Sequence, residues 1–124
     1  MKTIQFETKI DGLTIVQDVD ETIKYLKNGE TVARCEFGDS MLPIFKSGQY
    51  ARLTPCYNNP NIGDAVFCCV NGVWMIHLVW MVNKPSKQCL IGDTSGNMYG
   101  WTSEILAIAT PMNYIQETFF IKNE

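Results

Sequence analysis

The fold of this chain is decided by residues 65–82, which read AVFCCV-NG-VWMIHLVWMV. Two apolar runs, 65–70 and 73–82, are rich in β-branched and aromatic residues and are separated only by Asn71-Gly72. Both of these residues tolerate positive φ, and Asn-Gly between apolar runs is the strongest short signal for a two-residue type I′ turn. The stretch therefore predicts an antiparallel β-hairpin.

The position of the turn also predicts which side chains of the hairpin share a face. With Asn71-Gly72 as the turn residues, Val66 lies opposite His77, and opposed residues project on the same side of a sheet. His77 then shares an apolar face with Val66, Cys68 and Met75. Such a setting disfavours the imidazolium ion and keeps the ring neutral near pH 7, as a general base requires. The alternative is a core histidine that is hydrogen-bonded to backbone.

Outside this hairpin the sequence predicts a mainly β protein with one short N-terminal helix. The residues from Ile4 to Ile10 alternate in polarity, and Asp11-Gly12 predicts a second tight turn, before an extended segment 13–16. Asp18 and Glu21 resemble a capping box at the start of a helix over 19–28, which Asn28-Gly29 ends. The further expected strands are 31–37, 50–53, 88–91 and 105–110, with residues 92–100 expected to form a turn.

Length and composition limit the classes of function. The chain has 124 residues, the length of one domain, with 46% hydrophobic and 19% charged residues. Its net charge of −3 and its scattered basic residues argue against a nucleic-acid partner. No run approaches the ~20 apolar residues of a membrane-spanning helix, and residues 1–7 lack the core of a signal peptide. We therefore expect a soluble, cytoplasmic protein without a membrane anchor.

The five cysteines are expected to be reduced thiols that pack as small apolar side chains. No Cys-x-x-Cys pair occurs, and the chain has a single histidine, so neither a metal site nor a cofactor is expected. A cysteine nucleophile is the alternative. None of the cysteines lies in a glycine–proline turn of the kind that surrounds Ser40.

A candidate nucleophile lies in the sequence Gly38-Asp39-Ser40-Met41-Leu42-Pro43. Gly38 permits a sharp turn after the expected strand 31–37, and Pro43 restricts the backbone that follows Ser40. This arrangement is expected to expose the Ser40 hydroxyl close to backbone amides that would stabilise an oxyanion. The alternative is an ordinary turn serine.

Five segments together resemble the serine peptidases that include type I signal peptidases and the self-cleaving domain of the LexA repressor. The Gly-x-Ser-Met-x-Pro sequence at 38–43 resembles the nucleophile box of this family. The other segments follow in the family's order over residues 22–110, and they are Gly63–Val66, Trp74–Val79, Ile91–Asp93 and Ile105–Ala109. The resemblance implies twisted antiparallel sheets of the LexA/signal peptidase type.

The resemblance also implies roles for individual residues. His77 is found where the bacterial and LexA-type members have a lysine base, and it matches the endoplasmic-reticulum and archaeal branch. Ser40 would be the nucleophile, His77 the base and Asp93 the residue that orients His77. For Asp93 an Asx turn is an equally weighted alternative. Gly38, Met41 and Leu42 would line the groove for an extended peptide.

Three positions depart from the family's pattern. Leu78 follows the histidine where its branch has arginine, Gln49 follows Gly48 where an aspartate is usual, and Thr94 follows Asp93 where asparagine is usual. These departures leave two hypotheses open. The first is a soluble serine endopeptidase that cleaves an extended peptide or protein substrate, and the second is a catalytically silent subunit of the same fold with a binding or structural role.

The chain is expected to form a single peptidase-like domain over 1–124. Within it, 1–18 would be an N-terminal hairpin, 22–110 the family-like core and 111–124 a C-terminal extension. The apolar segment 115–121, which contains Phe119 and Phe120, is expected to add a strand or to mediate contact with a second copy of the chain.

Overall fold

The computed structural model describes residues 2–3, 8–56, 60–115 and 122–123, and the expected segments at 4–7 and 116–121 lie outside them. The described part is mainly β with antiparallel sheets and one helix, which confirms the coarse fold class. Its elements are β1 (Lys2–Thr3), β2 (Lys9–Ile10), β3 (Leu13–Thr14), α1 (Val19–Lys27), β4 (Val32–Cys35), β5 (Gln49–Pro55), β6 (Ala65–Val70), β7 (Val73–Asn83), β8 (Gln88–Gly92), β9 (Met98–Thr102), β10 (Ile105–Ile115) and β11 (Lys122–Asn123).

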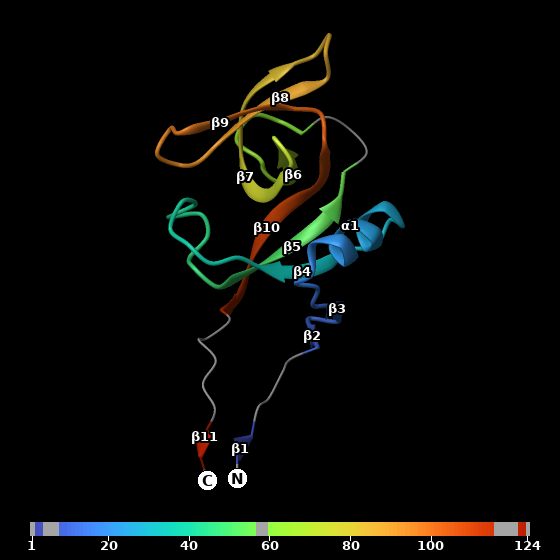
Figure 1. Ribbon diagram of the computed structural model, residues 1–124, viewed down its shortest axis with the longest axis vertical. Coiled ribbons are helices and arrows are strands. Elements are labelled where there is room, and N and C mark those ends of the chain that lie inside the picture. Colours follow the sequence, from blue (N-terminus) through green and yellow to red (C-terminus); the bar gives the residue numbers. More distant parts are fainter. Residues whose placement is uncertain (1, 4–7, 57–59, 116–121, 124) are drawn as a thin grey trace.

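Seven strands form one twisted sheet in the order β4-β5-β10-β6-β7-β8-β9. The long strand β10 pairs with β5 on one side and β6 on the other, so it joins the N-terminal and C-terminal halves of the sheet. In Figure 1, β8 and β9 lie at one end of the molecule and the short β1–β11 pair lies at the other. The order places β4 at one edge of the sheet and β9 at the other.

Strand β6 is buried on both faces, which explains why its sequence is a continuous apolar run. Ala65 and Phe67 pack in one core with Leu26 of the helix, whereas Val66 and Cys68 pack in a second core with strands β7 and β8. A strand that alternates between two cores has no exposed face that would need polar residues.

The hairpin of β6 and β7 has the expected register. Asn71 and Gly72 have φ values of 50° and 81°, and Val66 pairs with His77 across the two strands. Asp11 and Gly12 likewise have φ values of 52° and 77°, so the predicted tight turn between β2 and β3 is also present. Two short turns that require positive φ thus fix two registers.

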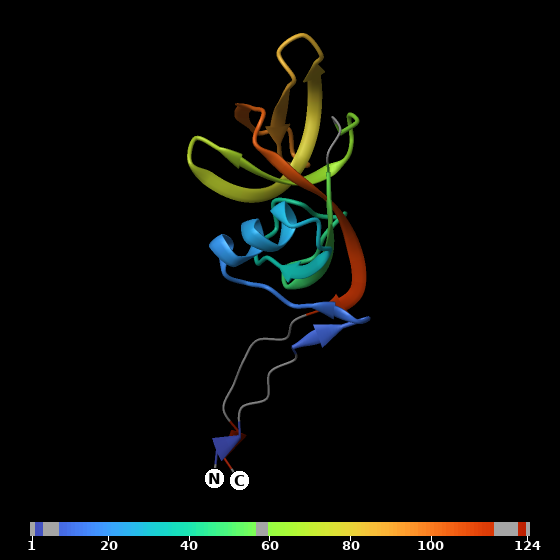
Figure 2. The same cartoon turned by 90° about the vertical axis from the view of Figure 1, so that its right-hand side faces the viewer.

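The helix α1 begins and ends where the sequence predicts. The Asp18 carboxylate accepts a hydrogen bond of 2.9 Å from the Glu21 amide, and Gly29 ends the helix at a φ of 81°. Figure 2 shows the helix packed against the half of the sheet that contains β4 and β5. The buried side chains of Thr22 and Leu26 make this contact.

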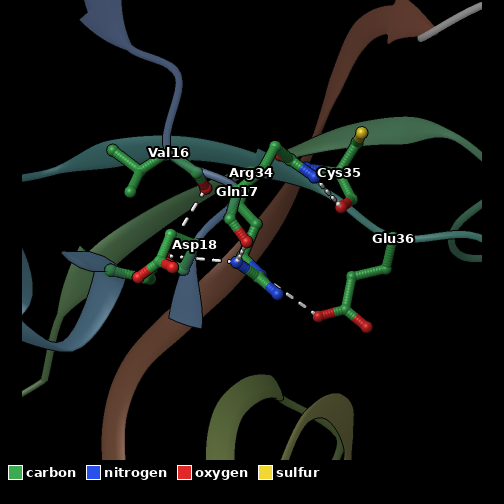
Figure 3. A network of polar contacts seen from close by, with 7 residues as sticks. Val16, Gln17, Asp18, Arg34, Cys35 and Glu36 are labelled. Carbon is green, nitrogen blue, oxygen red and sulfur yellow. Dashed lines mark hydrogen bonds and ion pairs between the residues drawn. The ribbon is translucent and has the colours of Figure 1, made fainter. Parts of the chain in front are cut away.

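A buried arginine ties the segment before the helix to β4, as Figure 3 shows. The Arg34 guanidinium donates to the Gln17 carbonyl at 2.6 Å and to the Thr22 hydroxyl at 3.2 Å, and it pairs with Glu36 at 3.2 Å. The Gln17 side-chain amide forms two further bonds of 2.9 Å with the N–H and carbonyl of Cys35. The backbone groups of Cys35 at the edge of β4 are therefore paired with a side chain, whereas the Ala33 carbonyl accepts from the Val16 amide.

Two expected boundaries were wrong. Residues 92–100 are not one turn, because Met98–Thr102 forms strand β9 against β8. Strand β10 does not end at Thr110 but continues past Pro111 to Ile115. The pairing of β10 with β6 ends at Ala109. Pro111 lies beyond that point, so its missing N–H removes no hydrogen bond between β10 and β6.

No helix in the described part of the chain is long and apolar enough to span a membrane.

Candidate active site: the Ser40–His77 pair

The turn that follows β4 exposes Ser40. The Leu42 amide donates to the Asp39 carbonyl at 3.2 Å, and the Phe45 amide donates to the Met41 carbonyl at 3.0 Å. Met41 and Phe45 are buried in the core next to β5, which anchors the turn, whereas Ser40 is exposed. The nucleophile candidate thus protrudes from a turn that its neighbours hold in place.

Strand β7 places His77 beside this serine. The Ser40 Oγ and the His77 Nε2 lie 3.1 Å apart, although 37 residues separate them in the sequence. This distance is within the range of a hydrogen bond between a nucleophile and its general base. The structure therefore brings together the two residues that carried the sequence-based hypothesis.

The surroundings of His77 favour its neutral form. Burial lowers the pKa of His77 below its ordinary value, and the negative charge of Asp93 opposes this effect by raising it. The ring of Tyr99 covers the imidazole, with centroids 4.6 Å apart and planes tilted by 54°. A neutral imidazole can accept the serine proton, whereas an imidazolium cannot.

Asp93 does not form the expected hydrogen bond with His77. Its carboxylate accepts 2.9 Å bonds from the amides of Ser95 and Asn97 and from the Asn97 side chain, and a 3.3 Å bond from the Tyr99 hydroxyl. These bonds hold the pKa of Asp93 below its ordinary value, with the Asn97 side chain as the largest cause. Asp93 therefore forms the Asx turn that was the alternative prediction, because its carboxylate accepts hydrogen bonds from the amides that follow it in the sequence.

The second ring nitrogen of His77 is buried and has no hydrogen-bond partner among the described residues. In a Ser-His-Asp triad this nitrogen donates to a carboxylate, which sets the tautomer of the imidazole. The site is therefore a serine–histidine pair with Asp93 close by.

A pocket opens beside Ser40 and His77. Eleven residues line it, namely Glu36, Phe37, Gly38, Ser40, Met41, Phe45, Lys46, Gln49, Ala51, Ile76 and His77. Two of the three residues expected to line a substrate groove, Gly38 and Met41, are among these lining residues. Leu42 is not among the lining residues. Its side chain is exposed, and its carbonyl accepts a 2.6 Å bond from the Thr94 hydroxyl.

Two backbone amides of the Ser40 turn are available to an anion. The N–H groups of Ser40 and Met41 donate to no residue in the described part of the chain, whereas the Gly38 amide donates to the Ser47 hydroxyl at 2.9 Å. Unpaired backbone amides beside an attacking serine are candidates to stabilise the charge that develops on the carbonyl oxygen. The oxyanion donors would thus come from Ser40 and Met41.

The cysteines are poor candidates for a nucleophile. None of the five, all of which lie in the described part of the chain, forms a disulfide; four are buried and Cys56 is partly exposed. Burial raises the pKa of Cys68 to about 12 and also raises the pKa of Cys35 and Cys89. A thiol with a raised pKa forms little of the thiolate that reacts.

Sequence reasoning missed two residues of the site, Thr94 and Tyr99. Thr94 donates from both its amide and its hydroxyl toward the Ser40 turn, and Tyr99 covers His77. Both lie within the 92–100 segment that was expected to be a turn. For Thr94 the sequence offered one signal, because a threonine stands there where the family usually has asparagine. For Tyr99 the sequence offered no signal.

Comparison with known proteins found no relatives for this chain. No protein-family model matches it, and no significant match was found among curated proteins or among solved structures.

Proposed function

We propose that this protein is a serine endopeptidase of the signal peptidase/LexA type, which cleaves an extended peptide through Ser40 with His77 as general base. The observation that carries the proposal is the 3.1 Å contact between Ser40 Oγ and His77 Nε2 at the mouth of a pocket. It is supported by the burial that lowers the pKa of His77 and by the unpaired amides of the Ser40 turn.

The reaction begins when the Ser40 oxygen attacks the scissile carbonyl and His77 Nε2 takes the serine proton. The tetrahedral oxyanion accepts hydrogen bonds from the Ser40 and Met41 amides. As the C–N bond breaks, His77 gives its proton to the departing amine and an acyl ester remains on Ser40. Water then attacks the ester, His77 accepts a proton from it, and the carboxylic acid leaves as Ser40 recovers its proton.

The substrate would lie along residues 36–38, which follow β4 and line the pocket. Upstream of them, the Gln17 side chain already occupies the backbone groups of Cys35. An extended peptide that adds to this edge can therefore pair only beyond Cys35, and such pairing would carry its carbonyl toward Ser40.

One observation favours a second function, that of a catalytically silent binding subunit. The buried Nδ1 of His77 has no partner among the described residues, so none of them fixes the tautomer that a base needs. A protein that retained the pocket but lost catalysis would bind a peptide there without cleaving it.

Reaction with a fluorophosphonate probe, followed by peptide mapping by mass spectrometry, distinguishes the two functions. We expect one adduct, on the peptide that contains Ser40, and its loss in Ser40→Ala. Ser86→Ala is the matched control, because Ser86 is exposed in the turn between β7 and β8, outside the pocket lining. A folded wild-type protein that forms no adduct, yet binds peptides in a way that Phe37→Asp abolishes, would support the silent subunit instead, because Phe37 lines the pocket and is exposed.

A further inference from the structure

Thr94 connects the loop between β8 and β9 to the turn that carries Ser40. Its amide donates to the Ser40 carbonyl at 3.2 Å, and its hydroxyl lies 2.6 Å from the Leu42 carbonyl and 3.1 Å from the Ser40 carbonyl. A hydroxyl has one proton, so it donates mainly over the shorter distance. In Figure 1 the segment between β4 and β5 and the β8–β9 loop lie on the same side of the molecule.

These bonds are the main link between the Ser40 turn and the rest of the site. The other hydrogen bonds of residues 39–44 in the described chain are local to the turn, apart from the Ser40–His77 contact itself. Met41 contributes to the turn's position through burial in the core, and not through a hydrogen bond to another described element. The position of Ser40 relative to His77 therefore depends on Thr94.

The loop that presents Thr94 is itself rigidly held. The Asp93 amide donates to the Asn97 carbonyl at 3.0 Å, and the Asp93 carboxylate accepts from the Ser95 and Asn97 amides. The Trp80 indole donates to the Asp93 carbonyl at 3.0 Å, which fixes the loop to β7. Since His77 is also on β7, the loop has a defined position relative to the base.

We propose, on the basis of the endopeptidase function above, that Thr94 is a positioning residue that holds the Ser40 turn at attacking distance from His77. Asp93 fixes the loop from which Thr94 reaches the turn, and this is its role in place of a third triad member. Thr94 touches the carbonyls of Ser40 and Leu42 and not the reacting oxygen, so it acts through the backbone on either side of Met41.

The test compares two threonines that make the same kind of bond. Thr94→Val removes the hydroxyl that donates to Leu42, and Thr94→Ser retains it. Thr102→Val is the control, because the Thr102 hydroxyl donates to the Cys69 carbonyl at 2.6 Å in β6, outside the pocket lining. The second-order rate of fluorophosphonate labelling of Ser40 and the thermal unfolding midpoint are measured for each variant and for Ser40→Ala.

We expect Thr94→Val to label about 10 to 100 times more slowly than wild type, because small displacements of a nucleophile are costly in rate. Thr94→Ser is expected to restore most of the rate, and Thr102→Val to lower the unfolding midpoint without changing the rate. Because Thr94 carries no charge, the pH at which labelling is half-maximal should not move in Thr94→Val. The 15N shifts of His77, the only histidine, should change as its contact with Ser40 weakens.

The outcomes separate the two proposals. If wild type labels on Ser40 and Thr94→Val labels at the same rate, the positioning role of Thr94 is wrong while the endopeptidase proposal survives. The same conclusion follows if Thr94→Val slows labelling only as far as Thr102→Val does. If wild type does not label, or Ser40→Ala labels equally, the endopeptidase proposal fails and the role of Thr94 fails with it.

Discussion

The ring of Tyr99 lies against the imidazole of His77, with centroids 4.6 Å apart, and its hydroxyl donates to the Asp93 carboxylate at 3.3 Å. Tyr99 therefore contacts both the imidazole and the carboxylate, two groups that contact each other directly in a triad. Two opposing influences on His77 follow from this arrangement. Burial disfavours its protonation, and the charge of Asp93 favours protonation without a hydrogen bond between them.

The first prediction concerns the pH dependence of the reaction at Ser40. A general base must be neutral, and burial lowers the pKa of His77 below its ordinary value of 6.5. The rate of probe labelling should therefore rise with pH through a midpoint below 6.5 and stay flat above it. Asp93→Asn removes a charge that raises the pKa of His77, so its midpoint should move to lower pH.

The NMR titration of His77 checks this prediction independently of activity. Glu36 and Lys46 line the same pocket as His77, so Glu36→Gln and Lys46→Met are measured as controls for other charges. Ser95→Ala keeps the backbone amide that binds Asp93 and should leave the midpoint unchanged. A midpoint above 6.5, or one that rises in Asp93→Asn, would contradict the electrostatic account.

The second prediction separates the ring of Tyr99 from its hydroxyl. Tyr99→Ala uncovers the imidazole, and the lost desolvation should raise the pKa of His77 toward 6.5. Tyr99→Phe keeps the ring contact and removes only the bond to Asp93, so its midpoint should remain close to that of wild type. NMR titration measures the pKa of His77 in both variants. If that pKa rises equally in both, the Tyr99 hydroxyl and not its ring lowers the pKa in wild type.

The third prediction is that histidine, not lysine, is the base. Lys84 and Lys87 lie in the turn between β7 and β8, are exposed and do not line the pocket beside Ser40. His77→Asn should abolish labelling of Ser40, and Lys84→Ala and Lys87→Ala should label at the wild-type rate. Loss of labelling in a folded lysine variant, with His77→Asn still reactive, would transfer the base role to that lysine.

The sequence predicted the features that depend on local chemistry. Asn71 and Gly72 require positive φ for a two-residue turn, and that requirement alone fixes the pairing of Val66 with His77. The helix over 19–27 is likewise determined by Asp18 at its start and Gly29 at its end. In each case a few neighbouring residues suffice to specify the backbone.

The sequence did not predict strand β9, because residues 98–102 lack the alternating pattern of a half-buried strand. Tyr99 and Trp101 are exposed, and Gly100 adopts a φ of 143° between them. The strand forms because Ile91 and Leu90 of β8 provide a partner edge, which is information that β9 itself does not contain. Tyr99, and its place over His77, was missed for the same reason.

The role of Asp93 could not be decided from its own sequence context. Its carboxylate has two sets of candidate donors, the amides that follow it and the imidazole of His77 on another strand. The amides of Ser95 and Asn97 are close in sequence and bind it whatever the rest of the fold does. Only the three-dimensional structure shows that this leaves Nδ1 of His77 without a partner among the described residues.

The fourth prediction concerns the stability that the buried Arg34 provides (Figure 3). Arg34→Met keeps much of the apolar stem but leaves the Gln17 carbonyl without its 2.6 Å donor. We expect a loss of about 2 to 4 kcal/mol in the free energy of unfolding, since bonds to buried charged groups are strong.

Glu36→Gln is the matched control for Arg34→Met. The Glu36 side chain is 37% exposed, so its pairing with Arg34 is expected to contribute less than about 1 kcal/mol. Urea titration of the two variants measures both values. A larger loss in Glu36→Gln than in Arg34→Met would show that the ion pair, and not the bond to Gln17, stabilises this region.

The fifth prediction compares two glycines whose replacement by alanine is costly for different reasons. A Cβ on Gly92 would lie 2.7 Å from the Met98 sulfur, 2.8 Å from the Asn97 carbonyl oxygen and 2.9 Å from Trp80. Because the Asn97 oxygen is backbone, the Asp93 loop itself must shift. We expect Gly92→Ala to lose about 1 to 3 kcal/mol of stability and to slow labelling of Ser40.

Gly72→Ala provides the contrast. A Cβ there meets nothing within 4 Å, but the φ of 81° should cost about 1 to 2 kcal/mol. Gly72 lies at the tip of the β6–β7 hairpin, outside the pocket lining, so labelling should keep the wild-type rate. The two variants are compared by urea unfolding and by probe labelling under conditions in which both are folded. If Gly92→Ala labels as fast as Gly72→Ala, the Asp93 loop does not control the position of Ser40, because displacing it would have left the nucleophile in place.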